Sequence, residues 1–401
     1  MNIAIFTRVL PHHGIGGMQA VVWDLARIFS RLGSSVTVVT GALPGRPQIF
    51  HDDGVRIIAL SGVPWNRYSA AWWRGARNAF AHLAPTCDVV LGVSAAANSL
   101  LPLRNRFPQI PFVMQAHGTS VGEVLSKWRT GKLRNMLSSA RNVAWIFKDL
   151  RAYAQYDNIV AVGGRVETDL RAAPIHWSLP SGRVQLISNG IDTGLFRPDM
   201  QVRQQMRASF GWGDDTHVVV SASRLHAQKG VDLSLNAVSM LSRRMDSVRY
   251  LIVGDGPERR ALEEHAARVG LRERVHFAGA VSRDVLPGYL QAADTMLFTT
   301  THVEVGLPLN VLEALATGLP CVVSRHLFDN AMFGSNLFKV LPHDKDAVAN
   351  ALERALTIGA SPQSELPQNF SLAACAEAYI DLFSDLSNRR SGTKSTKHAH
   401  V

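Results

Sequence analysis

The chain has 401 residues, with 42 Lys and Arg against 32 Asp and Glu, so its formal net charge is +10. Hydrophobic residues make up 46% of the sequence and charged residues 18%, a composition that excludes disordered, collagen-like and disulfide-stapled small proteins. At roughly 100–200 residues per domain, the length predicts two domains or slightly more. The excess positive charge fits an anionic membrane surface, a phosphorylated substrate or nucleic acid, and composition alone does not choose among them.

Cysteine usage and hydropathy predict the compartment. Cys87, Cys321 and Cys375 are widely spaced and form no Cys-x-x-Cys pair, which favours a reducing compartment and argues against a zinc cluster. The N-terminus lacks the basic and long apolar regions of a signal peptide, and no apolar run approaches the roughly 18–20 residues needed to span a bilayer. We therefore expect a soluble, cytoplasmic protein.

The first 190 residues predict an α/β domain. Short runs that are apolar throughout alternate with segments of helical periodicity, which is typical of a parallel sheet covered on both faces. The predicted strands lie at residues 3–6, 36–40, 88–93, 110–114, 158–162 and 184–187.

The turn-rich stretch 189–198 predicts a linker, and the same plan repeats in the second domain, residues 191–370. Strands are expected at 217–222, 250–253, 275–277, 295–298 and 321–324, and helices at 231–242, 258–269, 287–292 and 309–317. An amphipathic helix at 371–387 closes the chain, and the polar tail 388–401 is expected to be disordered.

The first glycine-rich loop, Gly14-Ile15-Gly16-Gly17, lies between the first strand and its helix. Backbone amides and a helix N-terminus can bind phosphate at such a position. Gln19 occupies the place of the third glycine of the dinucleotide fingerprint, so the loop does not match that motif. The alternatives are an anion site, favoured by the two adjacent glycines Gly16 and Gly17, and a plain tight turn.

His117 follows the predicted strand 110–114, in the sequence Gln115-Ala116-His117-Gly118. It therefore stands at the carboxyl end of a parallel strand, the edge on which ligand clefts of α/β sheets open. A lone histidine is otherwise more often structural. Position and the following glycine favour a role in a cleft.

Segment 127–151 is predicted to be a basic helix in which aromatic and apolar residues interleave with the charges. A solvated helix face and a surface for lipid or an anionic acceptor explain this pattern equally well.

Arg224 and Lys229 frame the loop after the first strand of the second domain. Two cations beside a helix start suit a diphosphate leaving group in the absence of a metal ion. The alternative is a solvated basic loop.

Glu313 is expected in the first turn of its helix, where it and Asn310 could form a capping box. A carboxylate at this position could also bind two ribose hydroxyls, and the two roles are compatible. Asp344-Lys345-Asp346 resembles a metal-binding pair of aspartates, but it directly precedes a predicted helix, so we interpret Asp344 as an N-cap. We expect no metal site.

Taken in order, these stretches resemble the retaining, GT-B-fold glycosyltransferases of family 4 over nearly the whole chain. The motifs that carry the resemblance are Gly16-Gly17, His117-Gly118, Asn189-Gly190-Ile191-Asp192, Ser223-Arg224-Leu225 with Lys229-Gly230, Gly254-Asp255-Gly256-Pro257, and Gly306-Leu307-Pro308-Leu309-Asn310 with Glu313. The resemblance implies two Rossmann-like domains that face a cleft, with the last helix crossing back onto the first domain.

The resemblance also implies roles for individual residues. Arg224 and Lys229 would neutralise the diphosphate of a nucleotide-sugar donor, and Glu313 would hold its ribose. The remaining donor contacts would come from Gly16 and Gly17 at the phosphates, His117 at the transferred sugar, Phe277 and Gly279 beside the base, Leu307 and Asn310 near the β-phosphate and sugar, and Asn189 in its motif.

One position departs from the family pattern. The family signature has two glutamates separated by seven residues, but the residue eight places before Glu313 is Val305, and Glu304 stands one place earlier. Glu304 could contact the donor sugar if the loop bulges by one residue.

We therefore predict a metal-independent, retaining glycosyltransferase that moves a hexose-like sugar to a glycan or lipid-linked acceptor in cell-surface polysaccharide or glycolipid biosynthesis. Its expected partners are the nucleotide sugar, the acceptor and an anionic membrane surface at the inner face of the cell membrane, without nucleic acid. Two alternatives stay open: a GT-B-fold sugar-nucleotide epimerase, and a catalytically silent nucleotide-sugar-binding or scaffold protein.

Overall fold

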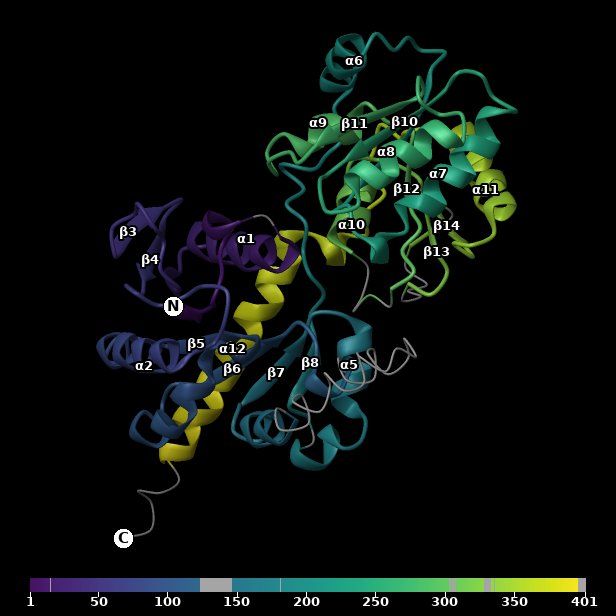
Figure 1. Cartoon of the computed structure of the whole chain (residues 1–401). Coiled ribbons are helices and arrows are strands. Elements are labelled where there is room, and N and C mark those ends of the chain that lie inside the picture. The colour runs from purple at the N-terminus through teal and green to yellow at the C-terminus, as the bar shows by residue number, and fades with distance from the viewer. Residues whose placement is uncertain are drawn as a thin grey trace. The chain divides into compact units, whose positions relative to one another are not determined.

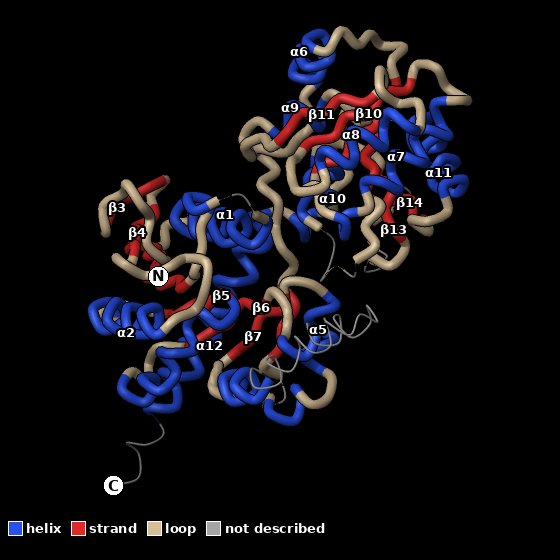
Figure 2. Tube along the Cα trace, viewed as in Figure 1, coloured by secondary structure: helices blue, strands red, loops and turns tan. Residues whose placement is uncertain are grey.

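The computed structural model describes residues 1–14, 16–122, 146–180, 182–302, 304, 308–327, 333–334 and 336–395. Most of the basic segment 127–151 therefore lies outside the described residues, as do Val305 and Leu307. The chain divides into two compact units, one formed by Met1–Gly190 with Leu372–Val401 and the other by Ile191–Ser371. Each unit is an α/β sandwich of strands between helices (Figures 1 and 2).

The first unit contains an eight-stranded sheet in the order β3-β4-β2-β1-β5-β6-β7-β8. Its strands are β1 (Asn2–Phe6), β2 (Ser35–Thr40), β3 (Ile49–Asp52), β4 (Val55–Ala59), β5 (Val89–Val93), β6 (Phe112–Ala116), β7 (Asn158–Ala161) and β8 (Val184–Leu186). All neighbouring strands are parallel except the β3–β4 hairpin. The sequence analysis did not predict this hairpin.

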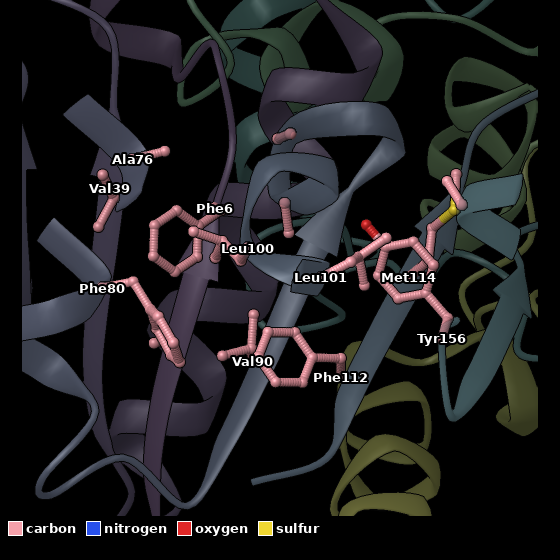
Figure 3. Packing of buried hydrophobic residues seen from close by; sticks show 14 of the residues in the cluster. Phe6, Val39, Ala76, Phe80, Val90, Leu100, Leu101, Phe112, Met114 and Tyr156 are labelled. Carbon is pink, nitrogen blue, oxygen red and sulfur yellow. The ribbon is translucent and has the colours of Figure 1, made fainter. Parts of the chain in front are cut away.

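Helices cover the sheet of the first unit. They include α1 (Gly17–Arg31), α2 (Ala70–Leu83), α5 (Gly164–Arg171) and α12 (Leu372–Ser395), with the 3-10 helices η1 (Pro11–His13), η2 (Ser94–Arg106) and η3 (Ile175–Ser178). In the core between them, the ring of Phe80 from α2 contacts the rings of Phe6 on β1 and Phe112 on β6, with centroids 6.4 and 5.6 Å apart (Figure 3). The core thus fixes the central strands, whose carboxyl ends carry the candidate site residues of this unit.

The second unit contains a six-stranded, fully parallel sheet. Its strands are β9 (His217–Ala222), β10 (Val248–Val253), β11 (Val275–Gly279), β12 (Thr295–Phe298), β13 (Cys321–Ser324) and β14 (Leu337–Val340). Its helices are α6 (Met200–Ser209), η4 (Ala227–Lys229), α7 (Val231–Ser242), α8 (Arg259–Arg268), α9 (Leu286–Gln291), α10 (Leu309–Ala316), α11 (Lys345–Ile358) and η5 (Gln368–Phe370).

The strand order of the second sheet, β11-β10-β9-β12-β13-β14, is the 3-2-1-4-5-6 order of a Rossmann fold. The chain leaves β9 toward β10 on one side and later returns to β12 on the other, so the order reverses between β9 and β12. In open parallel sheets, ligands bind outside the carboxyl ends of the strands at this switch point.

The last helix corrects the predicted tail. Residues 388–395 were expected to be disordered, but α12 continues to Ser395. The Arg390 guanidinium stabilises this end because it donates to the carbonyl oxygens of Pro108 and Ile110 at 2.6 and 2.8 Å and to Asp157 Oδ1 at 2.6 Å. Residues 396–401 lie outside the described part. None of the helices in the described residues is long and apolar enough to cross a membrane.

Candidate functional site

Arg224 follows β9 in a loop that two glycines hold in place. The Leu225 amide donates to the Asp255 carbonyl at 2.9 Å, which ties this loop to the one after β10. Gly254 has a φ of +134°, and a Cβ there would overlap the Ser223 carbonyl oxygen, while a Cβ at Gly256 would overlap the Leu225 carbonyl oxygen. The motif Gly254-Asp255-Gly256-Pro257 thus fixes the backbone beneath Arg224. The Arg224 side chain itself is exposed.

Lys229 ends the same loop and is paired with Glu304. Its Nζ lies 2.6 Å from Glu304 Oε1 and 5.3 Å from the centroid of the Phe298 ring. The two charged side chains are 22% and 16% exposed, respectively. The structure therefore brings Glu304 onto one of the two cations predicted to bind diphosphate.

The loops that carry Lys229 and Glu304, which follow β9 and β12, are joined by hydrogen bonds. Thr299 Oγ1 donates to the Gly230 carbonyl at 2.7 Å, and Thr300 Oγ1 donates to the Gln228 carbonyl at 2.9 Å. Gly230 has a φ of +63°, and a Cβ there would overlap the Thr299 carbonyl oxygen. Only glycine allows this approach of the two loops without strain.

Glu313 lies in the second turn of α10, not in the first as predicted, because the helix begins at Leu309. The predicted capping box is also wrong. Pro308 is the N-cap, and Asn310 Nδ2 instead donates to the Ala222 carbonyl at 2.7 Å. This bond ties the start of α10 to the end of β9. By contrast, the predicted N-cap is confirmed at Asp344, whose Oδ1 accepts from the Ala347 amide at 2.9 Å.

The Glu313 carboxylate is only 4% exposed and is paired with Arg283, whose Nη1 lies 2.6 Å from its Oε1. The Arg283 guanidinium also lies 5.1 Å from the centroid of the Phe196 ring. A buried carboxylate needs a cation or several hydrogen bonds to stay ionised. Sequence reasoning missed Arg283, which lies in the loop after β11, 30 positions before Glu313, and carries no motif.

Phe277 and Gly279, the residues expected beside the base, lie on β11. The Gly279 carbonyl accepts from the Gly254 amide at 2.8 Å, which joins this strand end to the loop beside Arg224. Arg259 at the start of α8 packs against the Phe277 ring at 5.9 Å and was also missed. The candidate residues of the second unit that the structure describes thus converge on the carboxyl ends of its strands.

In the first unit, Gly16 is the N-cap of α1 and Gly17 is its first residue. Gly16 has no side chain with which to cap this helix, and a helix N-terminus without a capping side chain is a position at which an anion can bind. Gly16 has an extended φ of −178°, and a Cβ there would overlap the side-chain oxygen of Gln19.

His117 directly follows β6 and is partly buried. Its Nε2 lies 2.9 Å from Gln115 Oε1, and Gln115 Nε2 donates to Tyr379 Oη on α12 at 2.9 Å. Burial lowers the pKa of His117 to about 4 because desolvation disfavours the charged imidazolium. The ring is therefore neutral near pH 7.

Asn189 lies near the end of the first segment of this unit. Its Oδ1 is buried and accepts no hydrogen bond from any described residue. A donor group on a ligand would satisfy this oxygen.

Comparisons with known proteins place the chain in a family. The model described as "Glycosyltransferase Family 4" matches residues 15–195, and the one described as "Glycosyl transferases group 1" matches residues 216–357. The GDP-mannose-dependent alpha-(1-6)-phosphatidylinositol monomannoside mannosyltransferase of Mycolicibacterium smegmatis is 31% identical over 242 residues. That match covers 59% of this chain and 58% of the relative, less than two thirds of its length.

Solved structures share the fold. Sucrose-phosphate synthase from Thermosynechococcus elongatus is 19% identical, with a TM-score of 0.69 over 100% of both chains. Anabaena HepE in complex with UDP and glucose is 17% identical, with a TM-score of 0.67 over 96% of this chain and 99% of that one. These similarities confirm the predicted GT-B fold. With both family models matched in order along the sequence, the chain belongs to the family 4, group 1 glycosyltransferases.

Proposed function

We propose that this protein is a retaining glycosyltransferase that transfers a hexose-like sugar from a nucleotide-diphosphate sugar to a glycan or lipid-linked acceptor. The observation that carries the proposal is the position of Arg224 and Lys229, two cations in one loop at the switch point of a Rossmann-ordered sheet. The family and the names of its relatives support a nucleotide-sugar donor and a glycolipid acceptor.

The charge that develops during transfer is that of the departing diphosphate. Arg224 and Lys229 would stabilise it as the bond between the sugar and the phosphate oxygen breaks. Fixed cations can perform this task without a metal ion, so we propose that the reaction is metal-independent. Glu313 would bind the ribose, and the neutral His117 would form a hydrogen bond to the sugar.

The acceptor side of the proposal includes a membrane surface. Of segment 127–151, the described residues 146–151 are helical. Phe147 is 64% exposed, and Lys148 and Arg151 are also exposed. An exposed aromatic ring beside cations suits an anionic lipid interface.

Donor turnover tests the main proposal. Arg224→Ala and Lys229→Ala should each lower turnover by about 10²–10³, the usual loss when a partner of transition-state charge is removed. Hydrolysis and transfer would be measured with a panel of nucleotide sugars, with Arg260→Ala as the control cation on α8 and thermal melting as the check on folding. EDTA should leave activity intact. Turnover within a few-fold of the parent in both variants would refute the assignment, and nucleotide binding without turnover in the parent would favour a silent binding protein.

The ion pair between Lys229 and Glu304 predicts a gain in binding. A diphosphate must displace Glu304 from Lys229, so Glu304→Gln should bind free nucleoside diphosphate about 2- to 5-fold more tightly, a gain of the size of one partly exposed ion pair. Titration calorimetry with GDP, UDP and ADP measures the change. Glu264→Gln, which removes the partner of the exposed Arg260, is the matched control. Unchanged or weaker binding by Glu304→Gln would show that the pair does not compete with the ligand.

The neutral state of His117 predicts a dependence of stability on pH. Its folded pKa of about 4 lies below the unfolded value of 6.5, so its contribution to the free energy of unfolding is complete above pH 6.5 and is lost as the pH falls toward 4. Between pH 7 and 5, the parent should lose about 1–2 kcal/mol more than His117→Gln. Urea unfolding at both pH values gives the difference. Parallel pH profiles for the two proteins would contradict the buried neutral state.

Membrane binding has its own test. Each basic residue near an anionic surface contributes about 1 kcal/mol at low salt, so Lys148→Glu with Arg151→Glu should lower partitioning onto phosphatidylserine vesicles at least about 10-fold. Arg260→Glu with Arg268→Glu on α8 is the matched charge control. Equal sedimentation of both double variants and the parent would identify residues 146–151 as a solvated face.

A further inference from the structure

Three side chains of the first unit form a chain of hydrogen bonds that ends at His117. Gln115 is 1% exposed and lies on β6, between β5 and β7. Tyr379 is fully buried on α12, and its ring contacts the ring of Phe29 on α1 with centroids 6.0 Å apart. A central strand and a packed helix therefore fix both residues that lead to His117.

The two ends of the Gln115 amide are chemically different, which gives the chain a direction. Nε2 donates to Tyr379 Oη, so Oε1 is the atom that faces His117 Nε2. A carbonyl oxygen can only accept a hydrogen bond, so His117 Nε2 must carry a proton. A neutral imidazole has one proton, and Nδ1 is then a lone-pair acceptor. No described residue forms a hydrogen bond with Nδ1.

We propose that Gln115 and Tyr379 are positioning residues that hold His117 as the Nε2–H tautomer, so that Nδ1 accepts a hydrogen bond from a hydroxyl group of the bound sugar. The identity of the ligand group rests on the proposed function, whereas the tautomer does not. His117 then binds the sugar as a hydrogen-bond acceptor and does not act as a general acid. Helix α12, through Tyr379, thereby determines which ring nitrogen of His117 contacts the ligand.

The reversed arrangement is the clear alternative. If Gln115 presented its Nε2 to His117, the tyrosine hydroxyl would donate to Oε1 and the His117 proton would lie on Nδ1. His117 would then be a donor to the ligand. The two arrangements differ in which nitrogen is protonated, and NMR distinguishes the nitrogens directly.

The test uses the full chain labelled with ¹⁵N-histidine and needs no ligand. Long-range ¹H–¹⁵N spectra at pH 7 report the protonation of each ring nitrogen, and His117→Gln identifies the His117 signals. The parent should show a protonated Nε2 and an unprotonated Nδ1. Tyr379→Phe should shift His117 to a mixture of tautomers, because Gln115 loses the acceptor that orients it.

Tyr250→Phe is the matched control, since Tyr250 is also fully buried and its hydroxyl bonds to Ser221 Oγ at 2.8 Å in the other unit. It should leave the His117 spectrum unchanged. A protonated Nδ1 in the parent, or an unchanged tautomer in Tyr379→Phe, would overturn the proposal.

Kinetics separate the positioning role from the proposed function. Tyr379→Phe should lower kcat about 3- to 10-fold and leave the Kd for free nucleoside diphosphate unchanged. Gln115→Glu places a carboxylate beside His117 and raises its pKa, so activity should fall at low pH and recover as the pH rises, a profile that a merely structural defect would not produce. If the tautomer result holds and kcat and the pH profile do not change, the positioning of His117 stands and its contact with the sugar is refuted.

Discussion

A parallel sheet covered on both faces leaves little room for polar side chains within its strands, and this constraint governs where chemistry can occur in the molecule. Strands β5 and β6 are buried at every position. Most candidate groups therefore come from connections that follow a strand: Arg224 after β9, Glu304 after β12 and His117 after β6. Gln115 is a buried polar residue within a strand, and it is tolerated because both ends of its amide have partners.

Glycine plays two different roles at these strand ends. At Gly230, Gly254 and Gly256, the missing side chain lets one backbone segment contact another, and the contact sets the position of the cations nearby. At Gly16, the backbone is extended at a helix N-terminus, and an added Cβ would meet the side chain of Gln19. Sequence motifs rich in glycine do not distinguish these positions, because a motif gives the residue type and not the backbone conformation.

The sequence predicted strands and helices correctly where apolar runs ended at polar residues. The structure confirms the predicted strands β9, β12 and β13 and the helix α7 with identical bounds. The β3–β4 hairpin was missed although its turn has the signature of two residues with positive φ, Asp53 at 46° and Gly54 at 79°. Strand β3 is short and half exposed, and so lacks the apolar run on which the prediction depended, whereas β4 has apolar residues interrupted by Arg56.

Contacts between distant residues could not be predicted in the same way. Lys229 and Glu304 are 75 positions apart, and they meet because β9 and β12 are neighbours in the sheet. The pair of Arg283 and Glu313 depends likewise on how the loop after β11 approaches α10. Sequence reasoning identified the carboxylates from the family pattern, but the partners of both became visible only with the strand order.

The two cations of the proposed diphosphate site differ in what balances their charge before a ligand binds. Arg224 is exposed, so water solvates its guanidinium and no counter-ion is required. Lys229 is largely covered and lies against an aromatic ring, where an unpaired ammonium would be costly, and Glu304 supplies the opposite charge. In the proposed function, a diphosphate would therefore meet no opposing carboxylate of the described residues at Arg224 and would reach Lys229 only by exchange with Glu304. The displaced position of Glu304 relative to the family pattern therefore has a physical consequence: the glutamate is the counter-ion of Lys229, and under the proposed function a bound diphosphate would release it.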